Sequence, residues 1–184
     1  MGTPEEPKPV KLFAALLAGD RELFPAVENQ LSALFGPIEA AGDILSWSVS
    51  DYYEREMGRG LLRRFVSFER PISPEALAEI KLKTKSVEES YRRAAEDGGG
   101  RRINIDPGYL DAGKVALAST KGGAHRIYLR AGIYAEATLL YYDGSFHPFI
   151  YTYPDYLWPE SAAFFAAARS RYLDQLRRNA KGLL

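Results

Sequence analysis

The chain has 184 residues, of which 46% are hydrophobic and 26% are charged, and its 24 basic residues balance its 24 acidic residues. With zero formal net charge, it has no overall positive field to attract nucleic acid or an anionic membrane, and no apolar run approaches the length that spans a bilayer. The absence of cysteine excludes disulfides, thiolate nucleophiles and cysteine-bound zinc, and it fits a reducing compartment. We therefore expect a cytoplasmic protein with no membrane partner, and we disfavour nucleic acid as a partner.

The length fits one domain preceded by a short tail. Pro4, Pro7 and Pro9 are interspersed with glutamates and indicate a loose N-terminal segment over residues 1–9. We expect residues 10–184 to form a single α+β domain.

Strands and helices are predicted to alternate over the first part of this domain. Residues 10–17 form an almost continuous apolar run, which is typical of a central strand. Leu23, Val27 and Leu31 follow at helical spacing, and Gly36-Pro37 ends that helix. Further strands are predicted over residues 45–49, 61–68 and 103–106, with a helix over residues 73–94. This order is that of the split βαβ, or ferredoxin-like, arrangement.

The last part of the domain is predicted to be an antiparallel meander closed by a helix. Strands are expected over residues 114–120, 125–129, 133–142 and 145–153, and a helix over residues 159–178. The predicted fold is α+β: a ferredoxin-like half extended by an antiparallel β-meander, with a C-terminal helix.

The final hairpin has a strong turn signal. Asp143-Gly144 is typical of a two-residue turn and pairs Tyr142 with Ser145. Continued along both strands, this register places Glu136 opposite Tyr151.

The preceding hairpin is predicted to turn at residues 130–132, with glycine in the left-handed position. This register pairs Arg126 with Glu136 and Tyr128 with Tyr134. We prefer it to a two-residue turn because opposed unlike charges gain about 0.2–1 kcal/mol. The other face of these strands then carries Ile127, Leu129, Ile133 and Leu139 as a predicted core face.

Polar and aromatic side chains gather on one face of the predicted meander, which makes this face the candidate site. The candidate ligand-binding residues are Lys114, Ser119, Thr120, Lys121, Arg126, Tyr128, Tyr134 and Tyr153. In this hypothesis the cations Lys114, Lys121 and Arg126 hold an anion, and the tyrosines form walls suited to stacking a flat ligand. The loop at residues 119–123 either cradles a phosphate through its backbone amides or is an ordinary hairpin loop.

Glu136 and Asp106 are the candidate catalytic residues, each as a general base or metal carboxylate. The alternative for Glu136 is a structural cross-strand pair with Arg126, and the alternative for Asp106 is a turn that ends a strand at Asp106-Pro107-Gly108. No ligand spacing predicts a metal site, and no motif specifies a cofactor or a reaction.

The chain has two histidines, His125 and His147. His125 has the parity of the predicted core face, whereas His147 falls on the polar face near a hairpin tip. An inward histidine is more often a hydrogen-bonded structural residue than a base, so we favour structural roles.

Several phrases occur in a characteristic order along the chain. They are DYY at 51–53, EMG at 56–58, NIDPGY at 104–109, LASTK at 117–121, HRIY at 125–128, GIYAE at 132–136 and TYPDY at 152–156. Through them the chain resembles, over residues 11–178, a family of bacterial proteins known as a domain of unknown function, number forty-four-sixteen. The resemblance implies no established activity. Some members are labelled GTP-binding, but the chain lacks the G-x-x-x-x-G-K-[ST] phosphate loop.

The leading hypothesis is a protein that binds a small anionic, nucleotide-like ligand on the polar and aromatic sheet face. In one version of this hypothesis it also turns that ligand over. The alternative is an interaction module that pairs with a protein partner, or with a second copy of itself, through the same face. Trp47, Tyr52 and Tyr53 are interpreted as core and rim residues that can also border the pocket.

Overall fold

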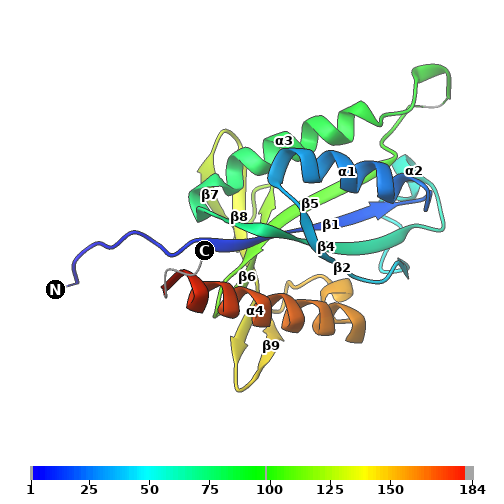
Figure 1. The fold of residues 1–184 in the computed structure, drawn as a ribbon. Coiled ribbons are helices and arrows are strands. Elements are labelled where there is room, and N and C mark those ends of the chain that lie inside the picture. The colour runs from blue at the N-terminus through cyan, green and yellow to red at the C-terminus, as the bar shows by residue number, and fades with distance from the viewer. Residues whose placement is uncertain (1, 98, 181–184) are drawn as a thin grey trace.

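The chain folds around one large antiparallel sheet with helices on both faces (Figure 1). This computed structural model describes residues 2–97 and 99–180, so the end of the predicted domain, residues 181–184, lies outside the described residues. The helices are α1 (Leu23–Phe35), α2 (Glu54–Met57), α3 (Leu77–Ser90) and α4 (Pro159–Ala180), with short 3₁₀ turns η1 (Pro74–Ala76), η2 (Ala95–Asp97) and η3 (Pro154–Leu157). The strands are β1 (Val10–Ala18), β2 (Ile38–Ala41), β3 (Leu45–Ser46), β4 (Leu62–Ile72), β5 (Ile103–Leu110), β6 (Lys114–Ser119), β7 (Ile127–Arg130), β8 (Ile133–Tyr142) and β9 (Ser145–Pro148).

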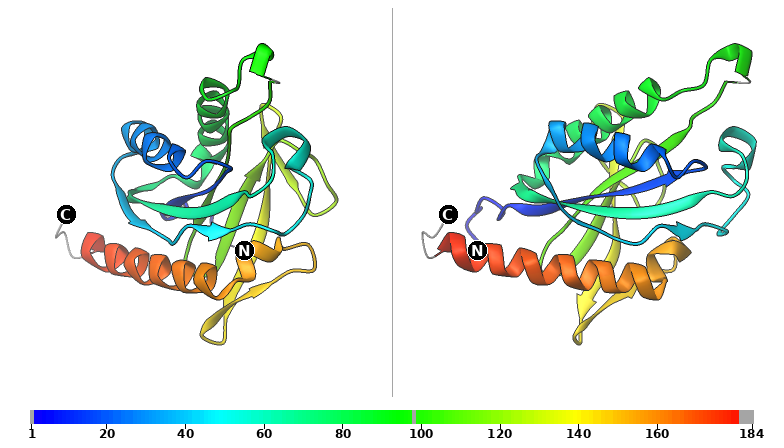
Figure 2. Two further views of the ribbon diagram at one scale, coloured as in Figure 1. Left: turned by 90° about the vertical axis from the view of Figure 1, so that its right-hand side faces the viewer. Right: turned by 45° about the vertical axis from the view of Figure 1, so that its right-hand side comes forward.

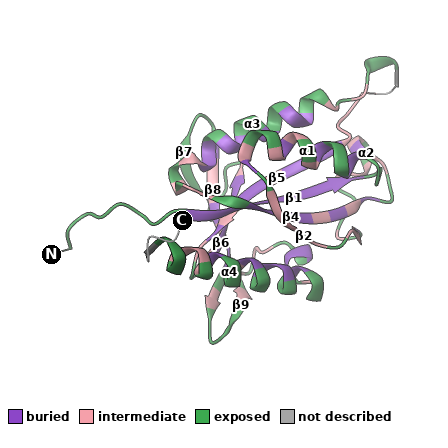
Figure 3. Cartoon of the chain, in the orientation of Figure 1, coloured by how far each residue is buried: buried purple, intermediate pink, exposed green. Residues whose placement is uncertain are grey.

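The strand order is β2-β4-β1-β5-β6-β8-β7, with β3 paired to β4 and β9 paired to β8. β1 lies between β4 and β5 and is buried along its whole length, which confirms the predicted central strand (Figure 3). Two views at other angles show α1 and α3 on one face of the sheet and α4 across the other (Figure 2). The mixed α/β class and the C-terminal helix are therefore confirmed.

Alternate residues of β1 supply the cores of the two faces. Leu12 and Leu16 lie in the cluster beneath α1 and α3, together with Val27 from α1. On the opposite face Phe13 packs edge to face on Phe165 of α4, with 5.1 Å between ring centroids. The period-2 pattern of one central strand thus fixes where three helices dock.

The segment after α1 differs from the prediction. A short strand, β2, pairs with β4 directly after Pro37, and the predicted strand over residues 45–49 is limited to β3. Trp47 still donates a backbone hydrogen bond to the Leu61 carbonyl at 2.8 Å, and its side chain lies in a separate small core with Leu17 and Met57. After Trp47 the chain leaves the sheet. This excursion, residues 47–60, carries α2 and later forms one wall of the site.

The prediction that a strand ends at Asp106-Pro107-Gly108 is wrong. β5 continues through these residues to Leu110, with Ala14 of β1 opposite Pro107. Proline is tolerated here because its missing N–H removes no hydrogen bond to β1 and the pairing with β6 begins only at Gly108.

The last hairpin is shorter than predicted. Tyr142 pairs with Ser145 as expected, but β9 ends at Pro148, so the predicted pairing of Glu136 with Tyr151 is wrong. Proline cannot continue the ladder, and the chain turns after it. The Tyr151 hydroxyl instead donates to the Ala137 carbonyl at 3.1 Å.

The hairpin of β7 and β8 keeps the predicted register by a different route. Tyr128 lies opposite Tyr134 as expected, but the turn is a two-residue one at Ala131 and Gly132, with φ values of 51° and 75°. A register shift between Tyr128 and Arg130 absorbs the extra residue.

The prediction that Ile127 and Leu129 belong to the core is wrong, because β7 is an edge strand and these residues are 74% and 39% exposed. Ile133 and Leu139 on β8 are buried as predicted. Within residues 2–97 and 99–180, no helix has the length and apolar character needed to cross a membrane.

Candidate functional site

The site begins where two neighbouring strands separate. β5 and β6 pair only from Gly108 opposite Leu117 to Leu110 opposite Val115. On the N-terminal side of Gly108, β5 continues beside β1 alone, while β6 continues beside β8. The sheet is therefore open between residues 103–107 and residues 118–121.

Two side chains of α3 occupy the edge of β5 that β6 leaves unpaired. The Glu88 carboxylate accepts a hydrogen bond from the Ile105 backbone N–H at 2.7 Å, and Lys81 Nζ donates to the Ile105 carbonyl at 2.8 Å. Buried backbone groups need partners, and these side chains take the place of a neighbouring strand. Both backbone groups of Ile105 are therefore satisfied although no strand pairs with this edge of β5, so the fold keeps the opening without an unpaired polar group.

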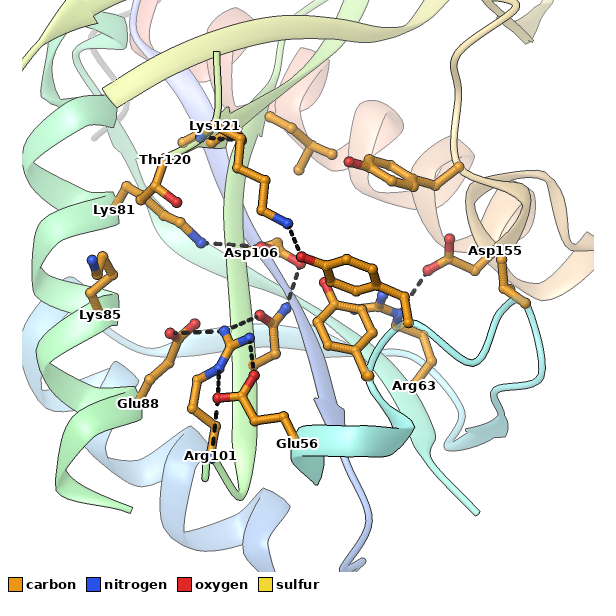
Figure 4. Close-up of a pocket in the computed structure, with 18 of the residues that line it drawn as sticks. Glu56, Arg63, Lys81, Lys85, Glu88, Arg101, Asp106, Thr120, Lys121 and Asp155 are labelled. Carbon is orange, nitrogen blue, oxygen red and sulfur yellow. Dashed lines mark hydrogen bonds and ion pairs between the residues drawn. The ribbon is translucent and has the colours of Figure 1, made fainter. Parts of the chain in front are cut away.

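A cavity of about 510 Å³ fills this opening, which is within the usual range for small-molecule sites. Its walls come from α3, β5 and β6 and from the segment after β3, residues 47–60. Glu136 of β8, Tyr153 and η3 complete the lining (Figure 4). The wall-forming residues used below are Trp47, Tyr52, Tyr53, Glu56, Arg63, Lys81, Lys85, Glu88, Arg101, Asn104, Asp106, Lys121, Glu136, Asp155 and Tyr156.

The structure gathers most of the predicted site residues around this cavity. Those that line it are Asp106, Ser119, Thr120, Lys121, Arg126, Glu136 and Tyr153. Lys114 does not, because the β5–β6 ladder lies between it and the cavity, and Lys114 pairs with Asp111 instead. Tyr128 and Tyr134 pack on each other at 5.4 Å between ring centroids and also lie outside the lining.

Asp106 is held as a carboxylate at the back of the opening. It accepts hydrogen bonds from Lys81 at 3.1 Å and from Asn104 at 2.6 Å (Figure 4). Burial acts to raise the pKa of Asp106, but the charges of Lys81 and Arg63 and these hydrogen bonds outweigh it and lower the pKa. Asp106 is therefore an anion whose charge is already compensated.

Arg101 connects both sides of the lower wall (Figure 4). Its guanidinium donates to Glu56 at 2.8 and 2.9 Å and to Asn104 at 2.8 Å, and lies 3.6 Å from Glu88. The hydrogen bonds from Arg101 lower the pKa of Glu56, whereas burial raises the pKa of Glu88. This network fixes α2 against α3.

A buried ion pair lies at the other end of the cavity. Arg63 Nε is 2.8 Å from Asp155 Oδ2, and the side chains are 6% and 2% exposed. Burial raises the pKa of Asp155 despite the neighbouring guanidinium. The pair joins β4 to η3.

Glu136 is held through one of its two carboxylate oxygens. Arg126 Nε lies 2.7 Å and His125 Nε2 lies 3.1 Å from Glu136 Oε2. The same guanidinium donates to the Tyr153 hydroxyl at 3.0 Å and to the Lys121 carbonyl at 3.0 Å. The prediction that Arg126 meets Glu136 is therefore correct, although Arg126 precedes β7 and the pairing of β7 with β8 ends at Ile127 opposite Ala135.

One of the two histidines lies in a position that parity did not predict. His125 precedes β7, is 32% exposed, and stacks on Tyr151 with 4.2 Å between ring centroids. The expectation of an inward position is wrong because the loop after β6 extends further than predicted. His147 stacks on Tyr142 in the β9 hairpin, away from the cavity.

Two lysines of the lining, Lys85 and Lys121, are exposed and have no carboxylate partner among the described residues. The part of the cavity next to them is called the mouth. Lys85 lies on α3, one turn beyond Lys81 (Figure 4). Lys121 follows β6, donates to the Tyr52 hydroxyl, and lies 4.3 Å from the centroid of that ring. The remaining cations named above each have an acidic partner.

Several wall residues do not stand out from the sequence as site residues. Lys81 and Glu88 fall on the buried stripe of α3, which also carries Leu77 and Val87, and both are 5% exposed. A charge within an apolar helix stripe is itself a signal of a buried polar site. Tyr52 and Tyr53, which the sequence predicts as core and rim residues able to border the pocket, line the cavity.

The described residues contain no cluster of three or more His, Asp or Glu side chains suited to a metal ion. The cavity carboxylates Asp106, Glu136 and Asp155 each face a cation of the protein. The geometry therefore offers hydrogen-bonding and ionic chemistry at a preformed hollow.

The chain was compared with family models, with curated proteins and with solved structures. Neither the curated proteins nor the solved structures contain a match to it. The model of a family described as a domain of unknown function (DUF4416) matches residues 8–172, and the chain therefore belongs to that family.

Proposed function

We propose that the cavity between β5 and β6 binds a small anionic ligand. The observation that carries this proposal is the pair of mouth lysines, Lys85 and Lys121, which have no carboxylate partner among the described residues. The deeper charges are compensated within the protein, so an anion is the group that the mouth accommodates best.

The aromatic residues beside the mouth support a ligand with a flat or ring-shaped part. Tyr52 and Tyr53 lie edge to face at 4.9 Å, and Tyr53 meets Trp47 at 5.5 Å between ring centroids. Such a wall suits stacking or edge contact with a planar group such as a nucleobase. The hydroxyls of Ser119 and Thr120 are further donors at the same end.

The catalytic version of this proposal assigns the general base to Glu136 in preference to Asp106. The two carboxylates differ in what their oxygens contact. Both oxygens of Asp106 accept hydrogen bonds, from Lys81 and Asn104, whereas Glu136 Oε1 has no partner among the described residues. A base must reach the proton that it abstracts.

We also propose that the first half of the domain is ferredoxin-like and that the protein is cytoplasmic. The order β2-β4-β1-β5, with α1 and α3 on one face, supports a ferredoxin-like first half. The absence of cysteine supports the cytoplasm as the compartment.

A thermal-shift screen of GTP, ATP and phosphorylated metabolites tests the proposal. A ligand at a hundredfold excess over its dissociation constant stabilises the native state by about 2.7 kcal/mol. The variant Lys85→Met/Lys121→Met should weaken binding at least about tenfold, since charge-assisted hydrogen bonds are lost.

Lys83→Met is the matched control, because Lys83 lies on the same helix but pairs with Glu79 outside the cavity. It should bind as the parent does. No stabilisation of ligand-free protein by any of these compounds would count against an anion site.

Self-association through β7 is the second candidate function. β7 is an edge strand on which Ile127 is 74% and Tyr128 is 58% exposed. Exposed apolar edge strands readily pair with another strand. Light scattering should report a dimer that Ile127→Lys converts to a monomer, and a monomeric parent protein would exclude this candidate.

A further inference from the structure

Six polar atoms of cavity-lining residues are buried without a hydrogen-bond partner among the described residues. Three of them, Arg63 Nε, Arg63 Nη1 and Asp155 Oδ2, belong to the buried ion pair of Arg63 and Asp155. The other three are Glu136 Oε1, Trp47 Nε1 and the Tyr156 hydroxyl. Their residues are 3%, 9% and 3% exposed. Buried polar groups in native proteins nearly always have partners, so these atoms indicate a place that a bound molecule completes.

Glu136 presents an acceptor in a fixed orientation. Arg126 and His125 both engage Oε2, and Arg126 is itself anchored by the Lys121 carbonyl and Tyr153. The carboxylate cannot rotate without breaking these contacts. Because an ionised carboxylate only accepts hydrogen bonds, the group that meets Oε1 must be a donor.

The other two atoms set the complementary requirement. The indole N–H of Trp47 only donates, so its partner must be an acceptor, whereas the Tyr156 hydroxyl can do either. An ammonium group cannot accept, and a carbonyl cannot donate. Hydroxyl groups do both, and a chain or ring that carries several of them satisfies the whole set.

We infer that the ligand is a phosphorylated polyol, bound with its hydroxyls against Glu136, Trp47 and Tyr156 and its phosphate between Lys85 and Lys121. This inference rests on the proposed anion site and specifies the opposite end of the ligand. The shared chemistry is a phosphate ester of a hydroxyl-rich unit, as in a sugar phosphate or in the ribose phosphate of a nucleotide. Glu136 is then the residue that determines specificity for the hydroxylated unit.

Calorimetric titration with matched probes tests the inference. Ribose 5-phosphate and n-pentyl phosphate carry the same charged group, but only the first carries hydroxyls. The parent protein should bind ribose 5-phosphate roughly ten- to hundredfold more tightly, the usual range for hydrogen bonds to a charged group. Titration with AMP separates the two sources: tighter binding of AMP points to a nucleotide, and weaker binding points to a sugar phosphate.

Glu136→Gln should lower this preference at least severalfold, because a charged acceptor becomes a neutral amide, and should lower the affinity for n-pentyl phosphate much less. Equal affinities of the parent protein for both probes would overturn the inference while leaving the anion site intact. An equal loss of both affinities in Glu136→Gln would also overturn it. If the parent protein binds no phosphate compound, the inference and the proposed function fail together.

Tyr156→Phe keeps the test decisive if the loss of the Glu136 charge disturbs folding. This change removes only a hydroxyl that has no partner among the described residues. We expect the preference for ribose 5-phosphate to fall severalfold while the unfolding temperature of the ligand-free protein does not fall. A Tyr156→Phe variant that retains the full preference would contradict the proposed contact between the Tyr156 hydroxyl and the ligand.

Discussion

The carboxylate of Glu88 accepts a hydrogen bond from the backbone N–H of Ile105 at 2.7 Å, where a neighbouring strand would otherwise supply a carbonyl. Glu88→Ala removes this partner and leaves a buried N–H unpaired, which should destabilise the fold by about 1–3 kcal/mol. Glu88→Gln retains an acceptor and should cost less. Urea denaturation of both variants checks the order, and equal losses would show that the hydrogen bond to Ile105 is unimportant.

The buried pair of Arg63 and Asp155 should be far more sensitive to loss of one partner than of both. Arg63→Met leaves the Asp155 carboxylate buried without its cation, at a cost of about 3–5 kcal/mol. Replacing both residues by apolar ones of similar volume should cost much less. Unfolding free energies of the single and double variants measure this difference, and additive losses would contradict it.

Acid should weaken the fold through Asp106. Its pKa lies below the ordinary value of 3.8, so the unfolded chain takes up a proton at a higher pH than the folded chain does. The stabilising contribution is therefore present above the ordinary value and is lost as the pH falls through the lowered one. Unfolding free energies measured from about pH 6 to about pH 3 should fall less steeply for Asp106→Asn than for the parent protein.

Glu88 serves as the contrast for this pH series, because burial raises its pKa above 4.5. Its contribution is present below that value and declines as the pH rises through the raised pKa. Glu88→Gln should therefore make stability rise more steeply with pH, the opposite of Asp106→Asn. Changes of the same sign in both variants would contradict the assignment.

Gly108 should not tolerate a side chain. A Cβ atom there would lie 2.5 Å from Phe13 Cζ and would also clash with the Ala116 carbonyl oxygen. Gly108→Ala should therefore destabilise the protein by at least about 1–3 kcal/mol, the usual cost of overpacking. Gly113→Ala is the control, since the nearest atom to its Cβ is Asp111 Oδ1 at 3.7 Å. Thermal unfolding of the two variants compares them directly.

Local patterns in the sequence predict a strand, turn or helix correctly where the pattern is compatible with one kind of element only. The apolar run of β1, the Asp143-Gly144 turn and the stripe of α4 all lead to the observed elements. The contact of Arg126 with Glu136 also followed from charge matching.

The cavity itself was not predictable from periodicity, because it depends on a pairing that does not occur. Pro107 was interpreted as a turn residue, although in the fold it marks where β5 and β6 separate. In the sequence, Lys81 and Glu88 are only two residues of a predicted helix, because their partners are backbone groups of β5, distant along the chain. Non-local hydrogen bonds of this kind leave little trace in local spacing.

The short ladder from Gly108 to Leu110 is the seam that joins two half-sheets, β2-β4-β1-β5 and β6-β8-β7. A rotation about this seam would change the width of the hollow without disturbing either half. Amide hydrogen exchange along the seam therefore measures the free energy of local opening at the cavity entrance.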